Sequence, residues 1–118
     1  MTSLQALHAH LIREVFARAL AGDAELADSV GRFDGIVRLD DKDLLFTLPD
    51  LFRFLLSDFE RVGRGTLDVA ARDYKPFHRM LYRSRTNAQL RSFGALVVVE
   101  HADDDHALSL YRLTRCRD

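Results

Sequence analysis

The first twenty residues constrain the fold of this chain more than any other segment. Large apolar side chains recur there at steps of three and four residues, which is the repeat of a helix with one buried face. The residues of this stripe are Leu4, Leu7, Leu11, Ile12, Val15, Phe16 and Ala19. Thr2 or Ser3 can cap the first free amides, and Gly22 can end the helix. We therefore predict a long amphipathic helix from Leu4 to Leu20, followed by a short second helix over residues 23–30.

Short extended runs alternate with helix-like runs in the next part of the chain. GIVRL and LLFTL flank the polar cluster Asp40 to Asp43, an arrangement that predicts a β-hairpin. PDLFRFLLSDFERVG begins with a proline suited to a first helical turn and carries one apolar stripe, so it predicts a helix from Pro49 to Gly63. TLDVAARD, residues 66–73, fits a strand and a helix equally.

A helix break is expected in the arginine-rich segment that follows. Pro76 opens a predicted helix, and this helix must end near Arg85 because the later apolar residues leave its stripe. Thr86 and Gln89 have the spacing of a capping box, in which each side chain bonds a free amide at the helix start. We therefore predict a new short helix from Thr86 that is closed by Gly94.

The last third of the chain predicts a second hairpin. ALVVVEH and HALSLYRLT are strand-like runs on either side of an acidic ADDD turn. The first of these strands is apolar on both faces, which predicts a position inside the sheet. The sequence thus predicts an α+β fold: an N-terminal amphipathic helix, a short hairpin, further helices and a C-terminal β-hairpin. A length of 118 residues fits one domain, residues 1–118.

Composition excludes several classes of protein. Apolar residues make up 47% and charged residues 30%, which is typical of a globular fold and not of disorder. The net charge of −1 does not suit a basic nucleic-acid coat or a polybasic membrane binder. Cys116 is the single cysteine, so no intrachain disulfide or thiolate metal cluster can form. With no leader segment or long apolar run, we expect a cytoplasmic protein with no membrane partner.

One sequence order in the C-terminal two-thirds resembles a known family. The chain here contains a helix that ends in Leu-x-x-x-Gly and is followed at once by a strand. A polar tip comes next, and a returning strand ends in Tyr-x-Leu-Thr. The residues that carry this order are Leu90, Gly94, Tyr111, Leu113 and Thr114. It resembles the winged helix-turn-helix superfamily over about Leu44 to Thr114. In such proteins the helix before the wing enters the DNA major groove. The resemblance implies that Asn87, Gln89 and Arg91 face the bases.

Basic and acidic residues are unevenly distributed. Residues 61–91 hold eight basic side chains and two aspartates, a local charge of +6, whereas residues 23–60 carry −6. A basic stripe around a short helix is the pattern that phosphate binding requires. The predicted nucleic-acid-binding residues are Arg79, Arg83, Arg85, Asn87, Gln89 and Arg91. Opposite charges on neighbouring segments are equally compatible with pairing between those segments or with an ordinary solvated surface.

Two features favour a protein partner over duplex DNA. Asp103, Asp104 and Asp105 place three carboxylates at the tip that would approach the phosphates, and a helix of about seven residues is short for reading bases. Our first hypothesis is a regulatory or nucleic-acid-associated module that acts through the six predicted binding residues. The second is a protein-interaction or structural module without nucleic-acid binding. It would form a homodimer through the N-terminal helix, by an exposed apolar stripe, or through the acidic strands.

No motif nominates a metal or catalytic site. His101, His106 and Asp103 to Asp105 could ligate a divalent ion, but the sequence favours a tight turn, because aspartate side chains bond the local backbone and the spacing of a calcium loop is absent. Neither Cys116 nor any histidine belongs to a recognisable nucleophile motif, and phosphate-binding glycine loops are missing. We therefore expect a non-enzymatic protein without metal or cofactor.

Overall fold

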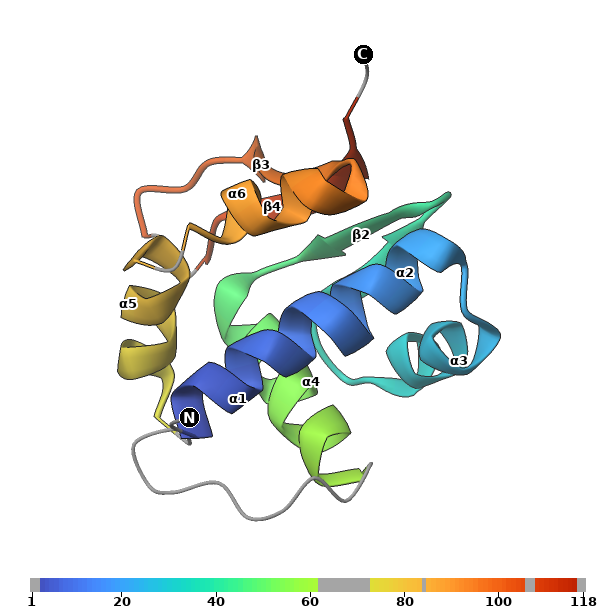
Figure 1. Cartoon of the computed structure of the whole chain (residues 1–118), viewed down its shortest axis with the longest axis horizontal. Helices are drawn as coiled ribbons and strands as arrows, with labels where there is room; N and C mark the ends of the chain where they lie inside the picture. Colours follow the sequence, from blue (N-terminus) through green and yellow to red (C-terminus); the bar gives the residue numbers. More distant parts are fainter. Residues whose placement is uncertain (1–2, 62–72, 84, 106–107, 117–118) are drawn as a thin grey trace.

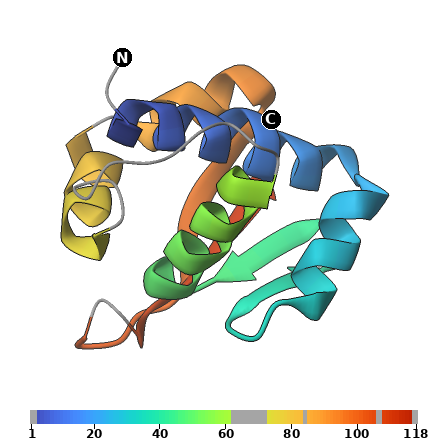
Figure 2. The ribbon, with the colours of Figure 1, turned by 90° about the horizontal axis from the view of Figure 1, so that it is seen from below.

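The computed structural model describes residues 3–61, 73–83, 85–105 and 108–116. Its fold is α+β, as predicted, with the helices on one side of an antiparallel sheet (Figures 1 and 2). The helices are α1 (Ser3–His10), π-helical η1 (Leu11–Phe16), α2 (Ala17–Ala21), α3 (Ala24–Arg32), α4 (Leu48–Arg61), α5 (Tyr74–Arg83), α6 (Thr86–Leu90) and 3-10 helix η3 (Arg91–Phe93). The strands are β1 (Val37–Asp40), β2 (Asp43–Phe46), β3 (Ala95–His101) and β4 (Leu110–Arg115).

The predicted N-terminal helix is confirmed and runs through α1, η1 and α2. It ends at Gly22, whose φ of 73° is the left-handed conformation that glycine adopts without steric cost. Its apolar stripe lies in the chain's own core, where Phe16 stacks on Phe46 of β2 with ring centroids 5.8 Å apart. The expectation of an exposed apolar stripe on this helix is therefore wrong. The sheet and α4 cover the face on which the homodimer hypothesis depended.

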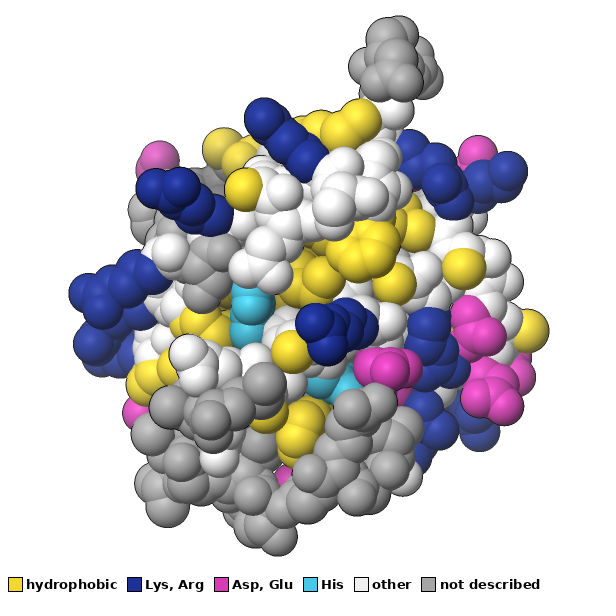
Figure 3. Space-filling view, in the orientation of Figure 1, with side chains coloured by type: hydrophobic (Ala, Val, Ile, Leu, Met, Phe, Trp, Pro, Cys, Tyr) yellow, Lys and Arg dark blue, Asp and Glu magenta, His cyan; other side chains and the backbone are white. Residues whose placement is uncertain are grey.

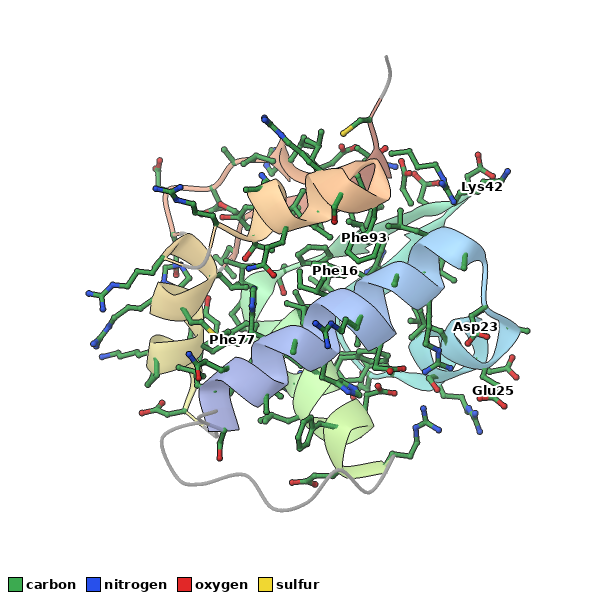
Figure 4. All side chains as sticks on the ribbon, in the orientation of Figure 1. Phe16, Asp23, Glu25, Lys42, Phe77 and Phe93 are labelled. Atoms are coloured by element: carbon green, nitrogen blue, oxygen red, sulfur yellow. The ribbon has the colours of Figure 1, made fainter. Side chains whose placement is uncertain are left out.

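The short helix expected over residues 23–30 is confirmed as α3. Asp23 caps it, because its carboxylate accepts the Leu26 amide at 3.0 Å and the Arg18 guanidinium at 2.6 Å. These bonds, that from Arg18 first, lower the pKa of Asp23. Figure 4 shows Asp23 and Glu25 on the side of the molecule opposite to α5.

Both predicted hairpins form, and they join into one sheet of order β1-β2-β4-β3. The predicted interior position of the ALVVVEH strand is wrong, because β3 lies at an edge and pairs only with β4 among the described strands. Its two apolar faces have different environments. Val97 and Val99 lie on the side of the helices, and Leu96 and Val98 lie on the outer face. Local apolarity therefore did not reveal the position of the strand in the sheet.

An ion-pair network spans the outer face of the sheet. The Arg112 guanidinium bonds Glu100 of β3 at 2.9 Å, Asp43 of β2 at 2.8 Å and Asp40 of β1 at 2.9 Å. Its bonds hold the pKa of Glu100 below the ordinary value. One β4 side chain thus links four strands, and it neutralises part of the negative charge of residues 23–60 by pairing with Asp40 and Asp43.

The helices of the second half begin close to their predicted positions. α4 begins at Leu48, one residue before Pro49, and α5 begins at Tyr74, two residues before Pro76, so both prolines lie in a first turn that tolerates them. Phe52 of α4 and Phe77 of α5 pack with ring centroids 4.8 Å apart. The ambiguous TLDVAARD segment lies outside the described residues except for Asp73. None of the described helices is long and apolar enough to cross a membrane.

Candidate functional site

Three basic side chains form a stripe along α5. Lys75, Arg79 and Arg83 follow one another at four-residue steps, so they lie on one face of the helix, and all three are exposed. The opposite face carries Phe77 and Met80, which are buried in the core. Figure 3 shows the dark blue side chains gathered along the left edge of the molecule, over α5. We call Lys75, Arg79 and Arg83 the α5 stripe.

The α5 stripe is not neutralised by the acidic segment. Among the residues that the structure describes, no carboxylate lies within ion-pairing distance of Lys75, Arg79, Arg83, Arg85 or Arg91. The acidic residues pair instead with other cations, which are Arg18, Arg53, Arg61 and Arg112. The pairing of the two oppositely charged segments, left open by the sequence, does not involve these five side chains.

The turn between α5 and α6 differs from the predicted capping box. α6 begins at Thr86 as predicted, but its N-cap residue is Arg85 and makes no side-chain capping bond. The Thr86 hydroxyl instead donates to the Leu81 carbonyl at 3.1 Å and lies 3.1 Å from His8 Nε2. The capping box is therefore wrong. Thr86 thus connects the end of α5 with the N-terminal helix and does not cap α6. Burial lowers the pKa of its neighbour His8.

Asn87 is committed to the edge of the sheet. Its amide nitrogen donates to the Val97 carbonyl at 3.0 Å, and its oxygen accepts the Val97 amide at 2.7 Å. These two bonds replace the missing neighbour strand at the free edge of β3, a standard way to protect such an edge. The base-facing role that the family resemblance implies for Asn87 conflicts with this bonding. Gln89 and Arg91, the other two base-facing candidates, are exposed.

The acidic tip of the C-terminal hairpin is a turn stabilised by its own backbone. The Asp103 carboxylate accepts the Asp105 amide at 3.0 Å, and the Asp103 amide donates to the Ser109 hydroxyl at 3.0 Å. Over the described part of the chain, no three His, Cys, Asp or Glu side chains converge as metal ligands do. His106, a member of the candidate metal cluster, lies outside the described residues.

His10 and Asp58 form a buried polar pair between the N-terminal helix and α4 that the sequence did not predict. His10 Nε2 lies 2.7 Å from Asp58 Oδ2, and Asp58 also accepts Arg61 at 2.8 Å. Burial alone would raise the pKa of Asp58, but the bonds from His10 and Arg61 outweigh it and lower that pKa. Within the described structure, His10 Nδ1 is buried with no partner. The pair thus links the N-terminal helix to α4 through a buried hydrogen bond, and we call it the His10–Asp58 clamp.

A second unpredicted feature is a cavity of about 550 Å³ beside the α5–α6 turn. Its walls come from the start of α4, the end of α5, α6 and the inner side of the C-terminal hairpin. Arg85, Asn87 and Asp103 lie on its rim or walls, so it adjoins part of the predicted binding residues. No local pattern could have indicated it, because its lining comes from positions between Phe16 and Tyr111.

Comparison with models of known families, with characterised proteins and with solved structures found no match to this chain.

Proposed function

We propose that this protein is a non-enzymatic, nucleic-acid-associated module that binds the phosphate backbone through the α5 stripe, with Arg85 and Arg91 extending the contact. The observation that carries the proposal is that the three cations of the α5 stripe share one exposed helix face and, like Arg85 and Arg91, have no carboxylate partner among the described residues. A cation whose charge is not already paired is free to replace the counterions that surround a nucleic acid.

The dimensions of the stripe suit a nucleic-acid strand. Its members are four residues apart, so at about 1.5 Å of rise per residue the stripe is about 12 Å long. Phosphates along one strand of B-form DNA advance by about 3.4 Å per nucleotide along the helix axis. The stripe therefore covers about three to four nucleotide steps, which is long enough for each of its three cations to meet a different phosphate.

Backbone contact is favoured over base reading. α6 contains five residues, and the amide of Asn87 is bonded to β3. In the winged-helix hypothesis α6 is the helix before the wing, and the exposed Arg91 that directly follows it can approach a base. The acidic tip would be repelled by phosphates, and Asp103 lines the same cavity as Leu81 of α5. A strand is therefore expected to lie toward the Lys75 end of the α5 stripe, away from the tip.

Salt dependence tests this proposal directly. The affinity for a fluorescein-labelled 20-base-pair duplex is measured by anisotropy between 50 and 200 mM salt. A slope of about −0.9 per phosphate contact gives about −2.7 for the stripe alone and about −4.5 with Arg85 and Arg91. Affinity should then fall about 40-fold to 500-fold over this fourfold range of salt.

Paired variants separate the stripe from general charge. Arg79→Ala with Arg83→Ala should make the slope shallower by about 1.8, since two phosphate contacts are lost. The matched control, Arg38→Ala with Lys42→Ala, removes two exposed cations from the first hairpin and should leave the slope nearly unchanged. Absence of binding at 50 mM salt, or equal losses in both pairs, would refute the proposal.

A further inference from the structure

The cavity beside the α5–α6 turn has the size and walls of a small-molecule site. Its volume of about 550 Å³ lies within the range of about 300–1,000 Å³ that is usual for ligand pockets. Phe16, Phe46 and Leu51 are buried residues at its inner end. Val97 and Val99 form one side, and Val99 is 57% exposed, so apolar surface continues to the rim. An apolar molecule in the cavity would therefore contact apolar side chains from the inner end to the rim.

The neutral polar groups on the walls are already used by the protein. The Thr86 hydroxyl bonds Leu81, the Asn87 amide bonds Val97, and the Ser109 hydroxyl bonds the Asp103 backbone. These side chains therefore hold the walls in place and have little bonding capacity left for a ligand. The charged residues on the lining are Arg85 and Asp103.

Arg85 is the charged group best placed to receive a ligand. Over the described residues its guanidinium has no hydrogen-bond or ion-pair partner, whereas the Asp103 carboxylate accepts the Asp105 amide. Arg85 also has a φ of 51°, a left-handed conformation that few non-glycine residues adopt. Such conformations concentrate at functional sites.

We propose that the cavity binds a small apolar molecule that carries a carboxylate or a similar anionic group. The anion pairs with the Arg85 guanidinium, which suits a planar carboxylate because its N–H groups can make two parallel bonds. The apolar body lies against Val97 and Val99. Asp103, on the hairpin side, repels an anion and so favours the orientation with the charge at Arg85. This inference does not depend on nucleic-acid binding.

Three probes of equal chain length test the charge that the cavity selects. Octanoate, octan-1-ol and octylamine are titrated into the full chain by calorimetry at pH 7 and low salt, without nucleic acid. Octanoate should bind at least tenfold more tightly than octanol, and octylamine most weakly. Equal binding of all three, tighter binding of octylamine, or no binding of any would overturn the proposal.

Two pairs of variants locate the binding. Val97→Phe fills the cavity and should abolish octanoate binding, whereas Val98→Phe, on the outer face of the same strand, should leave it intact. Arg85→Asn should weaken octanoate binding about tenfold, because the guanidinium that pairs with the carboxylate is removed, and should leave octanol binding unchanged. Asparagine is chosen because it tolerates the left-handed backbone at this position. Arg79→Asn is its control, since Arg79 is exposed but does not line the cavity. Thermal unfolding confirms that each variant is folded, and equal effects within either pair contradict the proposed site.

Discussion

Removing the Asp58 carboxylate should be among the most destabilising single changes in this protein. Asp58 and His10 are 2% and 1% exposed at their side chains, and they meet at 2.7 Å between α4 and the N-terminal helix. Because Asp58 is the acceptor, His10 Nε2 carries the proton of this bond. Asp58→Leu leaves this N–H buried without an acceptor. The other ring nitrogen of His10, Nδ1, is already buried without a partner among the described residues.

The magnitude follows from the bonds that are lost. An orphaned buried donor costs about 1–3 kcal/mol, and a hydrogen bond to a charged group contributes about 1.5–3 kcal/mol. The bond from Arg61 adds little, because the Arg61 side chain is 49% exposed. We expect Asp58→Leu and His10→Leu each to lower the free energy of unfolding by about 3 kcal/mol, at the lower end of the range for broken buried pairs.

A double-mutant cycle distinguishes a specific pair from general damage to the core. His10→Leu with Asp58→Leu removes both polar groups, so neither is left without a partner, and apolar replacements of buried pairs are often nearly neutral. Urea unfolding followed by circular dichroism at pH 7 should show a loss at least 2 kcal/mol smaller than the sum of the single losses. Additive losses would refute the assignment of the pair as a coupled clamp.

Two further predictions concern the contacts around α6. Burial lowers the folded pKa of His8 below its ordinary 6.5, so the unfolded chain takes up the proton first and stability should decline as the pH falls below about 6.5. His8→Gln should make this decline shallower in urea unfolding at pH 7 and pH 5, and an unchanged slope would contradict the role of His8. Asn87→Ala should lower the free energy of unfolding by about 1 kcal/mol and speed hydrogen exchange at the Val97 amide, because both bonds at the β3 edge are lost. Unaltered protection of that amide would show that the edge does not need Asn87.

Features that depend on neighbouring residues were predictable. The apolar repeat of the first twenty residues predicted the N-terminal helix, Gly22 its end, and Asp23 the start of α3. Both hairpins followed in the same way, because turns and one-sided burial are set over a few residues. The helix start at Thr86 was also predicted, although the capping box on which that prediction rested does not form.

Features that join distant residues depended on the fold. The apolar stripe of the N-terminal helix indicated burial but not whether the cover was this chain or a second copy. Likewise the sequence of β3 predicted a strand but not its place in the sheet. Its edge position was decided by the fold, in which β3 pairs with β4 and with no other described strand. Thr86 and Asn87 have typical capping chemistry, yet their hydrogen bonds go to Leu81 and Val97, beyond the first turn of α6.

The charge pattern of residues 61–91 showed that cations are concentrated, whereas the fold decided which of them remain available. Arg61 is held by Asp58, while Arg79 and Arg83 extend from α5 with no carboxylate in reach among the described residues. The cavity, too, exists only because the hairpin, α4 and the α5–α6 turn meet around one space. Periodicity and turn chemistry act along the chain, but ion pairs, strand order and cavities depend on distances through space that no local pattern encodes.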